Sequence, residues 1–151
     1  MYWFEVEFCQ MSEKQTIRFI INPFSGANNK AKIPVLIDEY LDKSKFEYTI
    51  HNTESAGHAT VLASQAVKDK IDIVVACGGD GTVNEVAKAL VNQPTTLGIV
   101  PSGSGNGFAM HIGLGRNAKK AIQIINTAQE KTIDSCKVND VFFLNLAGVG
   151  F

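Results

Sequence analysis

The chain has 151 residues, a length typical of a single domain, and its 14 lysines and arginines nearly balance its 15 aspartates and glutamates. This balance gives no basic field of the kind that attracts nucleic acid, so we expect no nucleic-acid partner. No apolar run approaches the ~20 residues of a membrane span, and the acidic N-terminus is unlike a signal peptide. Its three cysteines lack metal-ligand spacing, which favours reduced, buried thiols and a cytoplasmic protein.

The first predicted strand is the apolar run Ile17–Ile21, which follows a predicted N-terminal extension over residues 1–16. This strand is expected to end in the loop Asn22-Pro-Phe-Ser-Gly26, because proline cannot donate to a sheet ladder and glycine favours a turn. The loop offers the Asn22 amide, the Ser25 hydroxyl and free backbone amides to a ligand. Taken alone, it is more readily explained as a plain turn.

A helix is predicted over 33–41, where apolar side chains recur at helical spacing. An alternating strand is predicted over 46–50, and it ends near Thr53. A second helix follows, with periodic positions at Val61, Leu62, Gln65 and Ala66. Strands and helices therefore alternate along the first half of the chain.

The centre of the sequence is a strand, a glycine-rich turn and a helix in immediate succession. The β-branched run Ile73–Ala76 predicts a buried strand, and helical spacing begins at Val83, which places Gly78–Thr82 in a tight turn. Glycines let a backbone approach a ligand closely, and the first amides of a helix suit a phosphate. Asp80 would repel that phosphate unless it held a cation or a hydroxyl proton. An ordinary glycine-rich turn is the alternative.

A second turn of this type follows a short predicted strand at 97–100. It is Pro101-Ser-Gly-Ser-Gly-Asn-Gly107, with three glycines, two hydroxyls and one amide in seven residues. Turn geometry alone does not require so many polar and small residues, so we interpret the loop as functional. It leads into the segment Phe108-Ala-Met-His-Ile112.

A further helix is predicted over 118–125, and alternating segments at 132–138 and 141–146 predict a β-hairpin. The order β-α-β-α-β-α-β-α is typical of a three-layer α/β fold, a parallel sheet with helices on both faces. In such sheets ligands bind outside the carboxyl ends of the strands. Four polar loops follow strand ends and are expected to meet at one edge. They lie at Asn22–Gly26, Thr53, Gly78–Thr82 and Pro101–Asn106.

The two glycine-rich turns match neither a Walker loop, which needs Gly-Lys-Ser/Thr, nor the G-x-G-x-x-G dinucleotide motif. Backbone amides and hydroxyls can still hold a triphosphate if a metal ion shares its charge. Asp80 is the candidate carboxylate for phosphoryl transfer, since Glu85 is favoured in a first helical turn by the dipole alone. The histidines lack the spacing of a zinc hydrolase, and Ser102 and Ser104 lack the esterase elbow.

Three motifs occur in order along the chain: Asn22-Pro-x-Ser-Gly26, Gly78-Gly-Asp-Gly-Thr-Val-Asn-Glu85 and Pro101-x-Gly-Ser-Gly-Asn106. Together they resemble the catalytic domain of the diacylglycerol kinase and sphingosine kinase superfamily, most of all the soluble bacterial lipid kinases. The resemblance runs from about Ile17 to the C-terminus. It implies an enzyme that uses ATP and Mg²⁺ to phosphorylate a lipid hydroxyl.

The resemblance also implies which residues contact the nucleotide. By the family's pattern these are Asn22, Pro23, Ser25, Gly26, Thr53, Gly78, Gly79, Asp80, Gly81, Thr82, Asn84, Glu85 and Ser104. Asp80 is in addition the implied catalytic residue, associated with either the metal ion or the lipid hydroxyl. The resemblance leaves the metal ligands unassigned.

The sequence departs from the family in two places. Gly107 follows Asn106 where many relatives have an aspartate, so the carboxylate that they present there is absent. Family members also continue into a β-rich second domain, whereas this chain stops just after the predicted hairpin. We therefore expect an extension at 1–16, a nucleotide-binding domain at 17–130 and, at 131–151, the hairpin that begins the second domain. The isolated fragment is expected to be inactive.

A hairpin that lacks the sheet it would join exposes apolar edges, so we expect self-association through residues 132–151. The implied partners are ATP and a diacylglycerol-like or sphingoid-like lipid, with peripheral contact at the inner membrane face. Two alternatives stay open: an NAD kinase-like enzyme, which shares the Gly-Gly-Asp-Gly motif, and a nucleotide-binding module without catalysis. The loop Pro101–Asn106 favours the lipid kinase.

Overall fold

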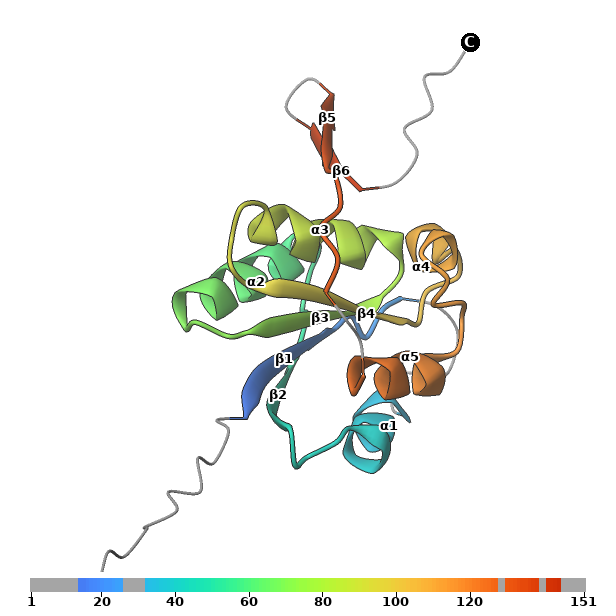
Figure 1. Ribbon diagram of the computed structural model, residues 1–151. Coiled ribbons are helices and arrows are strands. Elements are labelled where there is room, and N and C mark those ends of the chain that lie inside the picture. Colours follow the sequence, from blue (N-terminus) through green and yellow to red (C-terminus); the bar gives the residue numbers. More distant parts are fainter. Residues whose placement is uncertain (1–13, 26–31, 128–129, 139–140, 145–151) are drawn as a thin grey trace, which may run out of the picture.

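The computed structural model describes residues 14–25, 32–127, 130–138 and 141–144. Within these ranges the main sheet has four parallel strands in the order β2-β1-β3-β4 (Figure 1). The strands are β1 (Gln15–Ile21), β2 (Phe46–Asn52), β3 (Ile73–Gly78) and β4 (Thr96–Pro101). The predicted parallel α/β fold is therefore confirmed.

The two central strands, β1 and β3, carry the longest runs of buried apolar residues. Such runs are typical of parallel strands covered on both faces. Because side chains alternate along a strand, Phe19 and Ile21 point into one hydrophobic cluster and Ile20 into the other. The sequence pattern of β1 thus requires a layer of helices on each side of the sheet.

Those layers are formed by two pairs of helices (Figure 1). The pair on one face is α1 (Lys32–Tyr40) and α5 (Ala118–Ile125), and the pair on the other is α2 (His58–Lys68) and α3 (Asp80–Leu90). The short helix α4 (Gly107–His111) adds Phe108 and Ala109 to the cluster on the α2 and α3 face. Each predicted helix has its counterpart in the structure.

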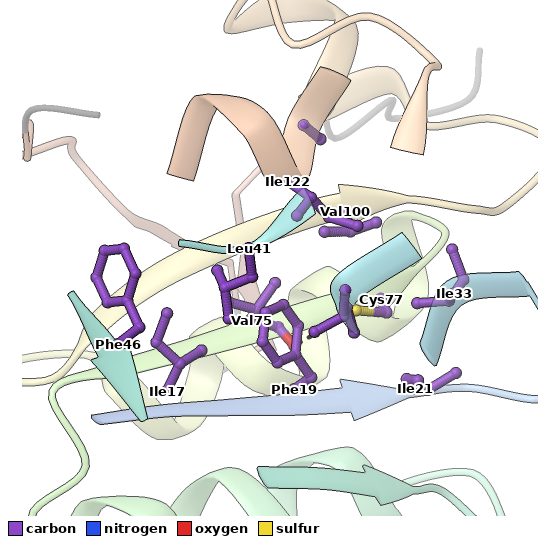
Figure 2. Packing of buried hydrophobic residues seen from close by; sticks show 12 residues of the cluster. Ile17, Phe19, Ile21, Ile33, Leu41, Phe46, Val75, Cys77, Val100 and Ile122 are labelled. Carbon is purple, nitrogen blue, oxygen red and sulfur yellow. Dashed lines mark hydrogen bonds between the residues drawn. The ribbon is translucent and has the colours of Figure 1, made fainter. Parts of the chain in front are cut away.

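The two cores differ in the size of their side chains. Figure 2 shows the cluster beneath α1 and α5, where Phe19, Ile33 and Ile122 are fully or almost fully buried. The face of α2 that packs against α3 is instead made of three alanines, Ala59, Ala63 and Ala66. Val61, which helical spacing placed among the periodic positions of this helix, is 62% exposed. Small residues at these positions let the two helices approach closely.

The C-terminal hairpin is a separate, two-stranded antiparallel sheet, shorter than predicted. It consists of β5 (Cys136–Val138) and β6 (Val141–Phe143). In Figure 1 it lies beyond α3, away from the main sheet. Cys77 is buried as expected, but Cys136 is exposed, so the prediction of buried thiols is wrong for that residue.

The strand order creates a crevice at one edge of the sheet. β1 and β3 are neighbours, yet β1 connects through α1 to β2 on one side and β3 connects through α3 to β4 on the other. The chain therefore leaves these two strands in opposite directions, and ligands of open α/β sheets bind at such a switch point. The ends of β1 and β3 lie side by side at this point, where Asn22, just after β1, donates its backbone N–H to Cys77 O of β3 at 3.0 Å.

Candidate functional site

The N-terminus of α3 lies at the switch point. β3 ends at Gly78, Gly79 has an extended backbone, and the helix begins at Asp80. The first amide to enter the helical ladder is that of Val83, which donates to Gly79 O at 3.1 Å. Within the described residues, the amides of Gly79 to Thr82 have no acceptor, and the N-cap makes no side-chain capping bond. This helix start is open to an anion.

Asn22 ties the loop after β1 to this helix start. Its side-chain Nδ2 donates to Thr82 Oγ1 at 3.1 Å, and its Oδ1 accepts the Phe24 amide at 2.8 Å. The Ser25 hydroxyl in turn donates to Asn22 O at 3.1 Å. A Cβ on Gly78 would overlap the Thr82 side chain, so only glycine lets the helix turn back this tightly.

The Asp80 carboxylate caps another helix. Its Oδ2 accepts the Gly107 amide at 2.9 Å, and its Oδ1 accepts the Phe108 amide at 3.0 Å. These are the first two amides of α4, so the negative charge lies against the positive end of that helix. The sequence had suggested a cation or a hydroxyl proton as the partner of Asp80. The structure supplies a third kind of partner, the backbone of the second glycine-rich loop.

The two glycine-rich loops touch backbone to backbone. A Cβ on Gly79 would lie 3.3 Å from the Gly103 Cα, and one on Gly103 would overlap Gly79. Asn106, which is only 4% exposed, holds the second loop in this position through hydrogen bonds to Gly103. Sequence reasoning included Asn106 in a motif but did not select it as a site residue. The Asn-Gly pair was the available signal, because asparagine tolerates the left-handed conformation that Asn106 adopts.

Two further proposed nucleotide contacts, Glu85 and Asn84, have partners on other elements. Glu85 Oε2 accepts the Ala59 amide at 3.2 Å and so caps the first turn of α2, where the N-cap residue is a glycine. Asn84 Nδ2 donates to Phe142 O, and its Oδ1 accepts the Leu144 amide, each at 3.2 Å. Asn84 therefore holds the hairpin segment through the backbone, as a neighbouring strand would.

The remaining proposed contacts lie at the same edge of the sheet or outside the described residues. Thr53 is buried and donates its backbone N–H to Ile21 O at 2.8 Å. Ser104 is exposed and adjoins Gly103. Contacts thus link Ser25, through Asn22 and the start of α3, to the loop that carries Ser104. Pro23 lies in the loop after β1, and Gly26 lies outside the described residues.

A pocket of about 280 Å³ opens beside Asp80. Its walls come from α3, α4 and the hairpin segment, and its lining is mostly apolar. The lining residues are Asp80, Gly81, Val83, Asn84, Phe108, Phe143 and Leu144. A carboxylate and a side-chain amide at the margin of an apolar pocket suit a molecule with one polar and one hydrophobic end.

Comparison with known proteins places this site in a family. The sequence pattern of the diacylglycerol kinase catalytic domain matches residues 16–138. The chain is 36% identical over 137 residues to a diacylglycerol kinase of Bacillus subtilis (strain 168). The aligned region covers 88% of this chain and 45% of that relative. It is 34% identical over 140 residues to a diacylglycerol kinase of Staphylococcus saprophyticus, and this aligned region covers 91% of this chain and 46% of the relative.

The folds agree as well as the sequences. The crystal structure of a diacylglycerol kinase from Bacillus anthracis str. Sterne superposes with a TM-score of 0.76 at 27% identity, covering 89% of this chain and 46% of that one. The chain thus spans slightly less than half the length of these relatives. The match extends over the sheet, both glycine-rich loops and the first strand of the hairpin. The chain therefore belongs to the diacylglycerol kinase catalytic domain family.

Proposed function

We propose that this chain is the ATP-binding half of a lipid kinase, which transfers the γ-phosphoryl group of ATP to a lipid hydroxyl. One observation carries the proposal: α3 begins at the switch point with its amides open, whereas α2 and α4, at the same edge, are capped. Glu85 caps α2 and Asp80 caps α4. Of these three helix starts, that of α3 is the one open to a phosphate.

The capping of α4 also removes an objection to phosphate binding. A carboxylate in the first turn of α3 would repel a triphosphate if it faced the same way as the helix amides. In the structure both Asp80 oxygens are engaged by α4 amides. The amides of Gly79 to Thr82 can therefore donate hydrogen bonds to phosphate oxygens. We propose the following residues as further nucleotide contacts: Asn22, Pro23, Ser25, Gly26, Thr53, Gly78, Asn84, Glu85 and Ser104.

We expect Mg²⁺ to arrive with the nucleotide. Within the described residues no group of three His, Cys, Asp or Glu side chains is placed to hold a metal ion. Asp80 is the carboxylate closest to the open helix start, and Mg²⁺ in kinases is bound by one or two carboxylates together with substrate phosphates. The residues present thus fit an ion carried mainly by ATP, which would neutralise charge on the transferring phosphate.

The acceptor is proposed to be a diacylglycerol-like lipid, in keeping with the names of the relatives. The pocket beside Asp80 combines apolar walls from Val83, Phe108 and Leu144 with a carboxylate that can orient a hydroxyl or take its proton. Phosphoryl transfer requires the acceptor oxygen in line with the γ-phosphate, and Asp80 adjoins both the pocket and the α3 amides. Contact with a bilayer would be peripheral; none of the helices in the described ranges is long and apolar enough to cross one.

The test is phosphate transfer by the complete gene product. We expect label from γ-labelled ATP to appear in diacylglycerol presented in mixed micelles, and none to appear in NAD. Asp80→Asn should reduce the rate by about 10²-fold or more, the usual range for a general acid–base residue. Asp72→Asn is the matched control, because Asp72 precedes β3 at the opposite edge of the sheet and bonds Thr16.

The possible outcomes separate the alternatives. Label in NAD would indicate an NAD kinase-like enzyme. Binding of ATP without transfer to any acceptor would indicate a nucleotide-binding module, and absence of ATP binding would refute all three functions. Because Asp80→Asn also disturbs the cap of α4, its melting temperature and ADP affinity are measured beside its rate. A rate loss with ADP affinity retained would assign the carboxylate to the chemical step.

A further inference from the structure

The loop between β4 and α4, residues 102–106, is held in shape by one side chain. Asn106 Oδ1 accepts the Gly103 amide at 3.1 Å, and Asn106 Nδ2 donates to Gly103 O at 2.6 Å. The side chain thus bonds both the backbone N–H and the backbone C=O of Gly103, and these two bonds close the loop into a ring. Asn106 is 4% exposed, so these bonds are shielded from competing water.

The backbone of Asn106 directs the chain toward Asp80. Its φ of 55° and ψ of 39° lie in the left-handed region, where asparagine is among the few non-glycine residues that occur readily. The next two amides, those of Gly107 and Phe108, consequently point at the Asp80 carboxylate. Asn106 therefore closes the loop that precedes it and orients the first amides of α4, which follow it, toward Asp80.

Both effects act on the open helix start of α3. Gly103, which Asn106 holds, lies against Gly79, with a separation that leaves no room for a Cβ on Gly103. Asp80, which the following amides hold, is the first residue of α3. The position of the loop 102–106 relative to the phosphate-binding amides thus depends on the Asn106 side chain.

We propose that Asn106 is a positioning residue for nucleotide binding. It presets the loop that carries Ser104 against the α3 N-terminus, and it holds the Asp80 carboxylate in place through the first two amides of α4. This inference rests on the proposed function, because it concerns the same nucleotide site. It adds a residue that acts through Gly103 and Asp80 and does not itself contact the nucleotide.

The variant that tests this proposal is Asn106→Gly. Glycine adopts the left-handed conformation without strain, so the backbone turn is retained while both side-chain hydrogen bonds are lost. The control is Asn92→Gly, because Asn92 has nearly the same conformation, with a φ of 57°, and lies exposed beyond the end of α3. Both substitutions make the same chemical change at nearly the same positive φ.

Nucleotide affinity is the first measurement. Calorimetric titration with MgADP and MgATP should show Kd raised about tenfold or more in Asn106→Gly. Only the molecules whose loop already has the binding conformation can bind, so the apparent affinity falls in proportion to the fraction of such molecules. Asn92→Gly should bind as the unaltered protein does. Asn106→Asp is a second variant: it keeps an acceptor for the Gly103 amide but places an oxygen against Gly103 O, and it should also weaken binding.

Hydrogen exchange is the second measurement, made without ligand. In Asn106→Gly the Gly103 amide should lose protection, while the Ser102 amide, which donates to Gly78 O at 3.0 Å, should keep it. Equal nucleotide affinity in Asn106→Gly and Asn92→Gly would overturn the proposal and leave the proposed function intact. Failure of the unaltered protein to bind either nucleotide would overturn the proposed function and this inference together.

Discussion

At the scale of the residue, the least expected side chain in the core is an arginine in a central strand. Arg18 is 8% exposed on the sheet face that α2 covers, and its Nη2 donates to Asp69 Oδ2 at 2.8 Å. Its Nε is buried and has no hydrogen-bond partner among the described residues. A buried cation depends on its counter-ion, so Asp69 matters more than a surface carboxylate usually does.

We predict that Asp69→Asn lowers the melting temperature at neutral pH and that the difference vanishes in acid. Hydrogen bonds from Gln65 and from Arg18 hold the pKa of Asp69 below its ordinary value. The carboxylate therefore stabilises the fold above the unfolded pKa of about 3.9, and that contribution is lost as the pH falls through the lower folded pKa.

Thermal melts of the two proteins between neutral and strongly acidic pH test this linkage. Asp134→Asn is the control, since Asp134 is exposed in the segment before β5. Its melting curves should follow those of the unaltered protein at every pH. A gap between Asp69→Asn and the unaltered protein that stays constant into strong acid would contradict the assigned role of the ion pair.

At the scale of the element, glycines in the two loops have opposite spatial requirements. Gly103 is packed against Gly79, whereas a Cβ on Gly81 would meet no protein atom within 4 Å. Gly81 lies in the first turn of α3, with a negative φ that alanine shares. Packing within the protein therefore explains Gly103 but not Gly81. The open space at Gly81 lies beside the amides that we propose to bind phosphate.

We predict that Gly81→Ala stabilises the fold and weakens nucleotide binding. Alanine in a helix is favoured over glycine by roughly 0.5–1 kcal/mol, so the melting temperature should rise. The added methyl points toward the N-terminus of the helix, where the phosphate is proposed to lie, so Kd for MgADP should increase. Undiminished affinity in this variant would place the phosphate elsewhere.

Gly103→Ala is the matched variant, expected to change stability in the other direction. Its Cβ would overlap the Gly79 backbone, which must then shift. Overpacking of this kind costs about 1–3 kcal/mol, so both the melting temperature and the MgADP affinity should fall. A stable Gly103→Ala protein would show that the contact between the two loops is looser than the structure indicates.

At the scale of the whole molecule, the C-terminal hairpin is joined to the rest of the described chain mainly through α3. Phe142 is 5% exposed, and Asn84 bonds the backbone on either side of Phe143. Residues 130–137, which include the first two residues of β5, are exposed, among them Ile133 at 50%. Exposed strand edges and apolar side chains recruit partner strands, which supports the proposal that the chain associates with itself here.

We predict that the protein self-associates with increasing concentration and that Ile133→Lys reduces this association. The added charge would have to be buried at an interface formed by the hairpin segment, which is unfavourable. Val61→Lys, at a residue 62% exposed on α2, is the control and should leave association unchanged. Light scattering over a range of concentrations measures the effect, and a monodisperse monomer throughout would refute the prediction.

Much of this molecule could be predicted from local sequence patterns. The buried strand at Ile73–Ala76 and the amphipathic helix after it appear where the sequence indicated, but the turn predicted over Gly78–Thr82 is shorter, because β3 runs to Gly78 and α3 begins at Asp80. Periodicity and turn chemistry are properties of neighbouring residues, which is why they can be read without a structure. The helix α2 shows the limit, because its buried face follows the close approach of α3 and not the most apolar residues.

The sequence by itself determined the order of strands and helices, the glycine-rich loops and the family. Only the tertiary structure decided that β1 lies beside β3, which makes the crevice, and that Asp80 bonds Gly107, 27 residues away. The physical reason is that a strand order or a hydrogen bond between distant residues depends on the packing of the whole chain. The same holds for Glu85, Asn84 and Asn106, whose partners lie on other elements or across a turn.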